Sequence, residues 1–257
     1  MTALLEARGL TKHFGGVLAL DRLDLAVAPN EILGLIGPNG SGKTTFFNVV
    51  TGIYRAEAGS IIFDGAEISR AAARTVYRVG ISRTFQRSRL SLPLSIFDNI
   101  MIGNHKHLNQ SLRFNLFRRG DFKREFEASY RAARALVEVF EPALADRLFE
   151  PVEGLPMIDR RRIEICRALI SAPKLLLLDE PSAGMTHDET RELMDDILLV
   201  RERNRNLTIV IVEHEMGVIE RITDRCAVLN FGRKIAEGPY RAVAADAQVQ
   251  QAYLGVA

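Results

Sequence analysis

Apolar and polar residues alternate along residues 4–30, a spacing of two that is typical of half-buried strands in an antiparallel sheet. Glu31–Ile36 follows as an apolar run that enters a glycine-rich stretch, and Gly42–Val50 continues as a predicted helix. Turn residues interrupt residues 58–70, so we expect a second hairpin there. The first part of the chain is therefore predicted to combine an antiparallel sheet with one strand–loop–helix unit.

Helical spacing replaces this alternation in residues 92–155 and is clearest in Tyr130–Phe140. Within that region, residues 103–121 are polar and contain Asn, Arg and Gly, so we expect a flexible insertion there. The second half of the chain alternates strands with helices, which is typical of an α/β core built on a parallel sheet. The predicted strands are 174–179, 207–212 and 226–230, and the predicted helices are 158–170, 189–203, one from about 215, and 240–255.

The composition of the 257 residues, 47% hydrophobic and 26% charged, is that of an ordinary globular protein. A net charge of +2 gives no indication of a nucleic-acid partner, and we expect the basic run Arg160–Arg162 to be a solvated helix face or a neighbour of a phosphate. Cys166 and Cys226 lie far apart in apolar stretches, so we expect small core residues rather than a disulfide or a metal site, which suits a reducing compartment.

The N-terminal sequence carries an acidic residue early and is not expected to be a signal peptide. No segment approaches the apolar length that crosses a bilayer. If the protein serves a membrane, we expect it to do so through a partner.

Gly37–Thr44 fits the pattern G-x-x-x-x-G-K-[ST], and it lies between a predicted strand and a predicted helix, as that pattern requires. Glycines let such a loop wrap closely around phosphates, while backbone N–H groups and the helix N-terminus attract the anion. Lys43 is expected to reach the β- and γ-phosphates of ATP, and Thr44 to offer its hydroxyl to Mg²⁺. The predicted nucleotide-binding residues are Gly37, Pro38, Asn39, Gly40, Ser41, Gly42, Lys43, Thr44 and Thr45.

Two acids, Asp179 and Glu180, end the apolar strand Leu175–Leu178, at the edge where open α/β sheets place their ligands. We expect Asp179 to hold Mg²⁺ and Glu180 to polarise the attacking water; alone, such a pair is also a common solvated strand end. His214 follows another apolar strand and is a candidate donor to the γ-phosphate, although a histidine at a strand end is more often structural.

Together these motifs resemble the ABC transporter ATPase family nearly from end to end. The resemblance implies that Gln86 is the glutamine that contacts Mg²⁺ and the membrane-subunit interface, that Ser182–Met185 is the D-loop, and that Glu180 and His214 are catalytic. Phe14 stands where the family stacks an aromatic ring on adenine, with a core role as the alternative.

For the fold, the resemblance implies an α/β P-loop NTPase (RecA-like) core with an antiparallel β subdomain and an inserted helical subdomain. The expected boundaries are a nucleotide-binding core at about 1–91 and 156–238, a helical subdomain at 92–155, and a helical tail at 239–257. The implied partners are membrane permease subunits, a second ATPase subunit and, indirectly, a solute-binding protein, at the cytoplasmic face of the inner membrane.

A finer resemblance is to the ATPases of branched-chain amino-acid uptake systems. The segments that carry it are Ile81–Gln86, Pro181–Met185, Glu213–Met216, Val228–Gly238 and Tyr253–Gly255. These segments do not specify the solute, so a lipid or lipopolysaccharide exporter stays as the alternative. A DNA-repair or translation ATPase is disfavoured because the chain has neither a long coiled-coil insertion nor a second cassette, and Glu180 and His214 argue against a regulatory protein that does not turn over.

One segment departs from the family. The signature L-S-G-G-Q corresponds here to Leu155–Asp159, in which Pro156 lacks both a hydroxyl and a backbone N–H. Ile158 is expected to obstruct close approach, and Asp159 to bring negative charge towards a phosphate or to cap the helix. Because each ATP in the family lies between one chain's phosphate loop and the other chain's signature, we expect an asymmetric heterodimer.

Overall fold

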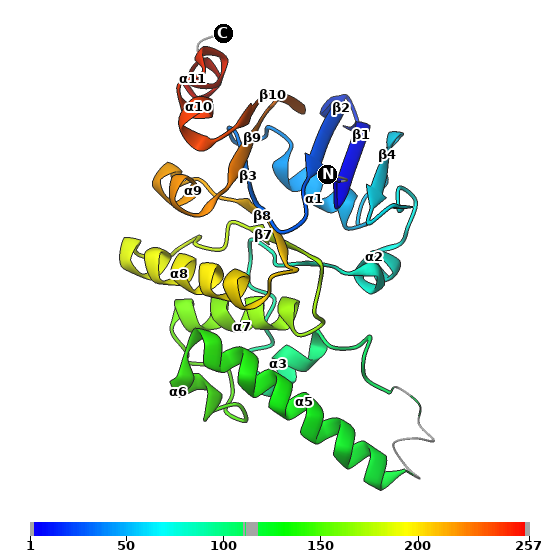
Figure 1. Ribbon diagram of the computed structural model, residues 1–257, viewed down its shortest axis with the longest axis vertical. Helices are drawn as coiled ribbons and strands as arrows, with labels where there is room; N and C mark the ends of the chain where they lie inside the picture. Colours follow the sequence, from blue (N-terminus) through cyan, green and yellow to red (C-terminus); the bar gives the residue numbers. More distant parts are fainter. Residues whose placement is uncertain (1–2, 110, 112–117, 255–257) are drawn as a thin grey trace. The chain divides into compact units, whose positions relative to one another are not determined.

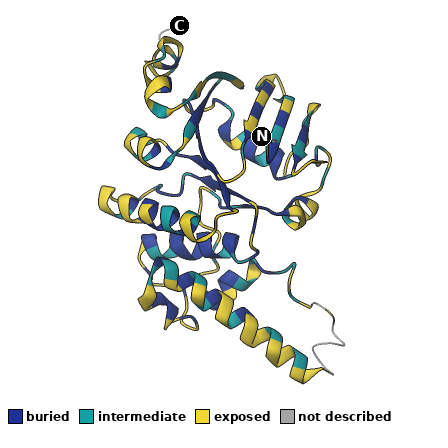
Figure 2. Cartoon of the chain, in the orientation of Figure 1, coloured by how far each residue is buried: buried dark blue, intermediate teal, exposed yellow. Residues whose placement is uncertain are grey.

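Short apolar runs build the centre of the fold, which the computed structural model describes for residues 3–109, 111 and 118–254. The strands β3 (Ile32–Ile36), β7 (Leu175–Asp179) and β8 (Thr208–Val212) are buried at every position (Figure 2). Burial on both faces is what a parallel sheet between helices requires, and it explains why these strands lack alternation in sequence.

These strands belong to a six-stranded sheet in the order β10-β9-β3-β8-β7-β6 (Figure 1). The pairs of β3, β8, β7, β6 (Ile81–Arg83) and β9 (Arg225–Asn230) are parallel, and only β10 (Arg233–Gly238) pairs in antiparallel fashion, with β9. The predicted α/β core with a parallel sheet is therefore confirmed.

The predicted antiparallel sheet is also present, with the strand order β2-β1-β4-β5. It consists of β1 (Leu5–Phe14), β2 (Val17–Val27), β4 (Ala58–Phe63) and the short β5 (Ala66–Glu67). One face carries buried apolar side chains, among them Leu10, Leu25 and Ile61, and these join the core that also contains Phe46 and Phe47.

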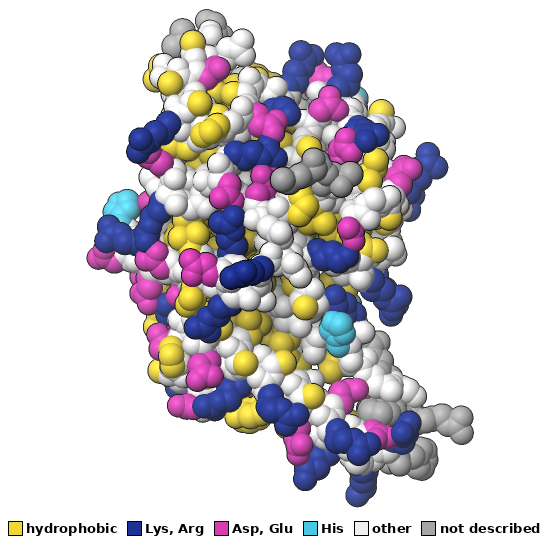
Figure 3. All heavy atoms as spheres, viewed as in Figure 1, with side chains coloured by type: hydrophobic (Ala, Val, Ile, Leu, Met, Phe, Trp, Pro, Cys, Tyr) yellow, Lys and Arg dark blue, Asp and Glu magenta, His cyan; other side chains and the backbone are white. Residues whose placement is uncertain are grey.

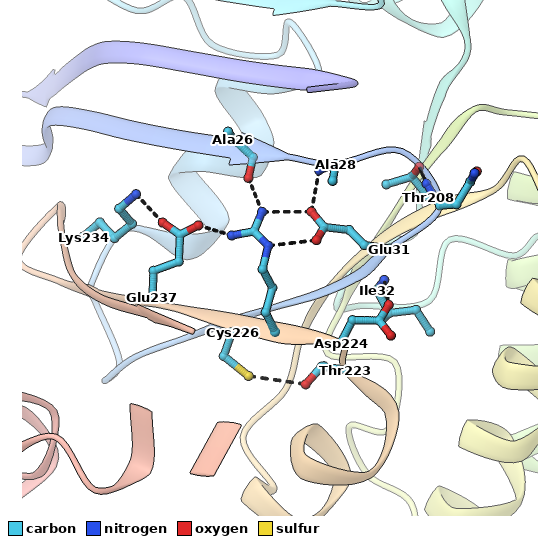
Figure 4. Close-up of polar contacts among 12 residues, drawn as sticks. Ala26, Ala28, Glu31, Ile32, Thr208, Thr223, Asp224, Cys226, Lys234 and Glu237 are labelled. Atoms are coloured by element: carbon cyan, nitrogen blue, oxygen red, sulfur yellow. Dashed lines mark hydrogen bonds and ion pairs between the residues drawn. The ribbon is translucent and has the colours of Figure 1, made fainter. Parts of the chain in front are cut away.

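Arg225 on β9 links the two sheets (Figure 4). Its guanidinium donates to both carboxylate oxygens of Glu31, at 2.8 and 2.9 Å, and also to Ala26 O on β2 and to Glu237 on β10. The Glu31 carboxylate in turn accepts the Ala28 amide at 2.5 Å. This bidentate, charge-assisted arrangement fixes the chain reversal between β2 and β3 against the neighbouring strands.

The chain forms two compact units. The first combines residues up to 83, 174–181 and 204 onwards, and the second combines 84–173 with 182–203. Besides both sheets, the first unit contains α1 (Lys43–Val50), α2 (Ala73–Val79), α9 (Met216–Ile222), α10 (Tyr240–Ala244) and α11 (Ala247–Leu254). The helices of the second unit are α3 (Ile96–Ile102), α5 (Arg119–Phe140), α6 (Pro142–Ala145), α7 (Met157–Leu169) and α8 (His187–Arg203).

Three elements, α2, β6 and β10, have no counterpart among the predicted ones. Val76 is the one buried residue of α2, and β10 has no fully buried residue, so neither carries a clear hydrophobic period. The expected insertion at 103–121 lies partly outside the described residues, since 110 and 112–117 are not described, and Arg119 already begins α5. Cys166 and Cys226 are buried free thiols, as predicted. Over the described residues, every helix is too short or too polar to cross a bilayer.

The expectation of a solvated basic run is wrong for Arg161 and Arg162, which are only 3% and 4% exposed. Arg162 donates to Asp196 at 2.9 Å and to Asp159 at 3.2 Å, and it also binds Glu192. Burial alone would lower the pKa of Arg162, but the hydrogen bonds to Glu192 and Asp196 outweigh it and raise that pKa. The two arginines are structural cations of the second unit.

We expect Arg162→Met to lower the free energy of unfolding by about 3–5 kcal/mol, because it leaves the buried Asp196 carboxylate without its cation. Arg160→Met, at the neighbouring and partly exposed position, is the matched control and should change it by less than about 0.5 kcal/mol. Urea denaturation measures both. Equal stabilities of the two variants would show that the buried ion pairs contribute nothing net.

Candidate functional site

The glycine-rich loop between β3 and α1 is held in a narrow space. Gly37 and Gly42 have φ of 145° and 107°, in the region that favours glycine. A Cβ at Gly37 would lie 2.1 Å from Leu229 O on β9, and one at Gly42 would lie 2.6 Å from Ala19 O on β2. Only glycine fits at both positions, so the loop's path is set by the backbones of both sheets.

The Lys43 side chain lies against this loop, and the residue is 6% exposed. Its Nζ donates to Gly37 O at 2.7 Å and to Pro38 O at 2.9 Å. Burial lowers the pKa of Lys43, while the nearby charges of Glu180 and Asp179 act in the opposite direction. The ammonium is therefore held across the loop by carbonyl oxygens, which phosphate oxygens can replace.

Asp179 ends β7 and is 1% exposed. Arg83, at the end of β6, donates from Nη2 to Asp179 Oδ2 at 2.7 Å and from Nη1 to Asn48 Oδ1 at 2.6 Å. Its guanidinium also lies over the Phe47 ring, 5.4 Å from the centroid. Burial raises the pKa of Asp179 in spite of Arg83, so this carboxylate depends on a neighbouring cation to stay ionised.

Glu180 has a positive φ of 48°, which is unusual for a residue other than glycine. Its amide donates to Val212 O on the adjacent β8 at 2.9 Å, so the turn after β7 is fixed by the sheet. The His214 Nε2 and the Glu180 Oε1 lie 2.7 Å apart. Backbone strain of this kind concentrates at functional sites, and here it places a carboxylate against an imidazole.

Other predicted site residues of the first unit lie at the surface. Thr44 is exposed and Thr45 partly exposed in the first turn of α1. Phe14 is 42% exposed, so the alternative of a core role is wrong. Its ring makes an edge contact with Tyr54 at 5.1 Å between centroids, and Lys12 Nζ lies 5.3 Å from its centroid. An exposed ring of this kind is available for stacking.

Gln86 and Ser182–Met185 belong to the second unit. The Gln86 residue is exposed, and its carbonyl accepts a hydrogen bond from Arg161 at 3.4 Å. Ser182–Met185 forms a turn in which the Met185 amide donates to Ser182 O at 3.0 Å and Gly184 has a φ of 83°.

The segment Leu155–Asp159 differs from its prediction. Ile158 is 8% exposed and faces the core of its unit, so the expected obstruction by its side chain is wrong. Asp159 binds Arg162 at 3.2 Å, so its charge is already paired within the helix. Pro156 and Met157 are the exposed residues, and Pro156 precedes α7 without a capping side chain.

Comparison with known proteins decides the family. A sequence model of the family described as ABC transporter matches residues 20–183. The chain belongs to the ABC transporter family. A second model, described as branched-chain amino acid ATP-binding cassette transporter, matches residues 233–257.

Individual relatives of this ABC transporter subunit agree. It is 38% identical over 255 residues to the high-affinity branched-chain amino acid transport ATP-binding protein BraF of Pseudomonas aeruginosa, and 36% identical over 255 residues to LivG of Escherichia coli K12, covering 99% of this chain and 98% of each relative. The crystal structure of an ADP conformation of an ATP-binding cassette of an ABC transporter superposes with a TM-score of 0.84 at 26% identity, over 99% of this chain and 100% of that one.

The protein is thus an ATP-binding and ATP-hydrolysing transporter subunit, and its P-loop NTPase α/β fold is confirmed. Sequence reasoning quoted Arg83 within Ile81–Gln86 but gave it no role. The structure shows it as the cation beside Asp179. The sequence carries no signal for this role, because β6 is only three residues long, Ile-Ser-Arg, and was not predicted as a strand.

We expect Arg83→Met to lower the free energy of unfolding by about 3–5 kcal/mol, because a buried carboxylate loses its partner. The double variant Arg83→Met/Asp179→Asn should recover part of this loss, because the uncompensated charge is removed as well. Urea denaturation of both single variants and the double variant gives the coupling energy. Additive losses would mean that the 2.7 Å contact stabilises nothing.

Proposed function

We propose that this subunit energises the uptake of branched-chain amino acids, or of similar small solutes, through a separate membrane permease. The observation that carries the proposal is similarity along the whole chain. BraF and LivG match 99% of it, and the C-terminal residues 233–257 match a model specific to branched-chain amino-acid systems. The motifs of the ATPase core alone do not indicate which solute is transported.

We propose that the phosphates of ATP bind at Gly37–Thr45, with adenine stacked on Phe14. The support is the loop geometry, in which buried Lys43 holds two carbonyls that phosphate oxygens can replace. Backbone N–H groups at the start of α1 face the same ligand, and the helix dipole favours its negative charge.

We propose that Mg²⁺ is held by Thr44, Asp179 and Gln86. Hydroxyl, carboxylate and amide oxygens are the ligands that Mg²⁺ prefers, so the donor set fits the ion. When bound, Mg²⁺ neutralises the charge that develops on the phosphates. Of the three residues, Gln86 belongs to the second unit, and its part in the site rests on the family resemblance.

We propose that Glu180 orients and deprotonates the attacking water and that His214 holds Glu180 in place. The 2.7 Å contact between His214 Nε2 and Glu180 Oε1 supports this pairing. The strained φ of 48° at Glu180 directs its side chain away from the path of a regular strand. Glutamine at this position would keep the shape but could not act as a base.

The proposed partners are those of an ATPase subunit that energises uptake through a permease. They are permease subunits at the cytoplasmic face of the inner membrane, a second ATPase subunit and, indirectly, a solute-binding protein, and no nucleic acid. Blue and magenta side chains are interspersed on the face seen in Figure 3, in keeping with a net charge of +2. Such a mixed surface offers no extended electrostatic footprint for nucleic acid.

We expect Lys43→Ala to abolish binding of a fluorescent ATP analogue, and Glu180→Gln to retain binding while single-turnover hydrolysis falls at least 100-fold, in line with the loss of a general base. In proteoliposomes with the co-purified permease and binding protein, Glu180→Gln should also stop ATP-driven leucine uptake. Unchanged binding in Lys43→Ala would remove the loop from the site. Hydrolysis at the wild-type rate in Glu180→Gln would show that Glu180 is not the general base. ATP hydrolysis without leucine uptake would contradict the proposal that this subunit energises uptake of branched-chain amino acids.

We also propose that the subunit works as half of an asymmetric heterodimer. Ile158 is buried and Asp159 is paired with Arg162, so the proposed asymmetry depends on Pro156, which cannot donate a backbone hydrogen bond to a phosphate on the opposite subunit. A lost hydrogen bond to a charged group weakens closure by about 1.5–3 kcal/mol, which is more than tenfold.

We expect the purified Glu180→Gln chain to stay monomeric with ATP in analytical ultracentrifugation and to dimerise with its co-purified partner. Adding Pro156→Ser, which restores a hydroxyl and an N–H, should allow a homodimer. In the assembled complex, Glu180→Gln should stop turnover, while the equivalent change in the partner should have a smaller effect. An active ATP-dependent homodimer of the unmodified chain, with equal loss in both complexes, would refute the asymmetry.

A further inference from the structure

Arg83 joins the strand and the helix that supply two of the proposed magnesium ligands. It ends β6, which pairs in parallel with β7 and brings Arg83 opposite Leu177, two residues before Asp179. The Arg83 Nη2 atom donates to Asp179 Oδ2 at 2.7 Å, and the Nη1 atom donates to Asn48 Oδ1 on α1 at 2.6 Å. One rigid, planar guanidinium therefore connects the end of β7 with α1.

The position of Asn48 relates this contact to the first turn of α1. Thr44 and Asn48 are four residues apart, so they lie on the same face of the helix, one turn from each other. Thr44 is the magnesium ligand that we propose on α1, and Asp179 is the one that we propose on β7. Arg83 thus binds one ligand directly and holds the helix of the other ligand one turn away from it.

The surroundings of the guanidinium restrict its movement. The side chains of Arg83 and Asp179 are only 5% and 2% exposed, so solvent screens this ion pair little. The guanidinium carbon also lies 5.4 Å from the centroid of the Phe47 ring, which is fully buried. A carboxylate, an amide oxygen and an aromatic face together hold the cation, and the cation in turn fixes the plane of the Asp179 carboxylate relative to α1.

We propose that Arg83 is a positioning residue of the magnesium site: it fixes the Asp179 carboxylate with respect to Thr44 on α1. The proposal rests on the proposed magnesium ligands. Mg²⁺ requires nearly ideal octahedral geometry, whereas Ca²⁺ accepts irregular arrangements of oxygen ligands. A fixed spacing between the two elements therefore favours Mg²⁺. Groups that orient metal ligands commonly change metal affinity by about 10- to 100-fold.

The test is Arg83→Lys, which keeps the charge but cannot hold two acceptors in the geometry of the guanidinium fork. Arg78→Lys, the same change at an exposed position of α2, is the matched control. Mg²⁺ and Ca²⁺ are titrated separately into the full chain with a fluorescent ADP analogue, and binding without metal is measured in EDTA. In Arg83→Lys, the Kd for Mg²⁺ should rise about tenfold and the Kd for Ca²⁺ by less than about threefold, with binding in EDTA unchanged.

A milder variant tests the same role if Arg83→Lys does not fold. Asn48→Ala removes only the acceptor on α1 and leaves the ion pair between Arg83 and Asp179 in place. It should raise the Kd for Mg²⁺ about threefold, because one hydrogen bond that holds the guanidinium is lost. A contact that served stability alone would lower the urea midpoint of this variant without changing the ratio of Mg²⁺ to Ca²⁺ affinity.

Three results overturn the positioning role. The first is a wild-type ratio of Mg²⁺ to Ca²⁺ affinity in both Arg83→Lys and Asn48→Ala. The second is tighter binding of both metals in Arg83→Lys, which would show that Arg83 only competes with the metal for Asp179. The third is an equal loss of Mg²⁺ affinity in Arg78→Lys.

Thr44→Val separates this proposal from the magnesium site on which it rests. Unchanged Mg²⁺ affinity in Thr44→Val would remove Thr44 from the proposed ligands, and the positioning role would fail with it. A loss of Mg²⁺ affinity in Thr44→Val, without a loss in Arg83→Lys or Asn48→Ala, would keep the proposed ligand and refute the positioning role alone.

Discussion

The absence of room for a side chain at Gly37 and Gly42 is the constraint on which the nucleotide site depends. The Leu229 carbonyl of β9 and the Ala19 carbonyl of β2 would lie 2.1 and 2.6 Å from a Cβ at these positions. The loop is therefore shaped by two different sheets at once. Arg225 on β9 links the same two sheets through its contacts with Ala26 on β2 and with Glu31 and Glu237.

Charge pairing is the second constraint, because buried charges gather where β6 and β7 end and α1 begins. Lys43 and Arg83 are the cations, and Asp179 and Glu180 are the anions, with Lys43 and Asp179 almost fully buried. Each would be costly alone in this environment, and each is partly compensated by the others. A nucleotide adds negative charge to this cluster. Because the cations already contact protein groups, we expect nucleotide binding to change those contacts.

Strands and motifs with local signals were predictable, and contacts between distant segments were not. The loop from Gly37 to Thr44 and the acids after β7 are defined by residues close in sequence. Arg162 contacts Asp196, which is 34 positions away, and Arg83 contacts Asp179, which is 96 positions away, so neither partner is visible in a local pattern. The same limit explains β10, whose half-buried residues show no period, and Ile158, whose direction depends on how α7 packs. The predicted subdomain boundaries and ligand roles stay predictions.

The packing of α7 also determines which residues of its first turn are buried or already paired. In sequence, three unusual residues, Pro156, Ile158 and Asp159, stand together in the signature segment. In the structure, the Ile158 side chain is buried, and Asp159 pairs with Arg162, a buried cation that binds three further carboxylates. An aspartate held in this way can add little negative charge to an approaching phosphate. In the heterodimer that we propose, the defect expected at this segment thus reduces to the N–H and hydroxyl that Pro156 lacks, which a single substitution can restore.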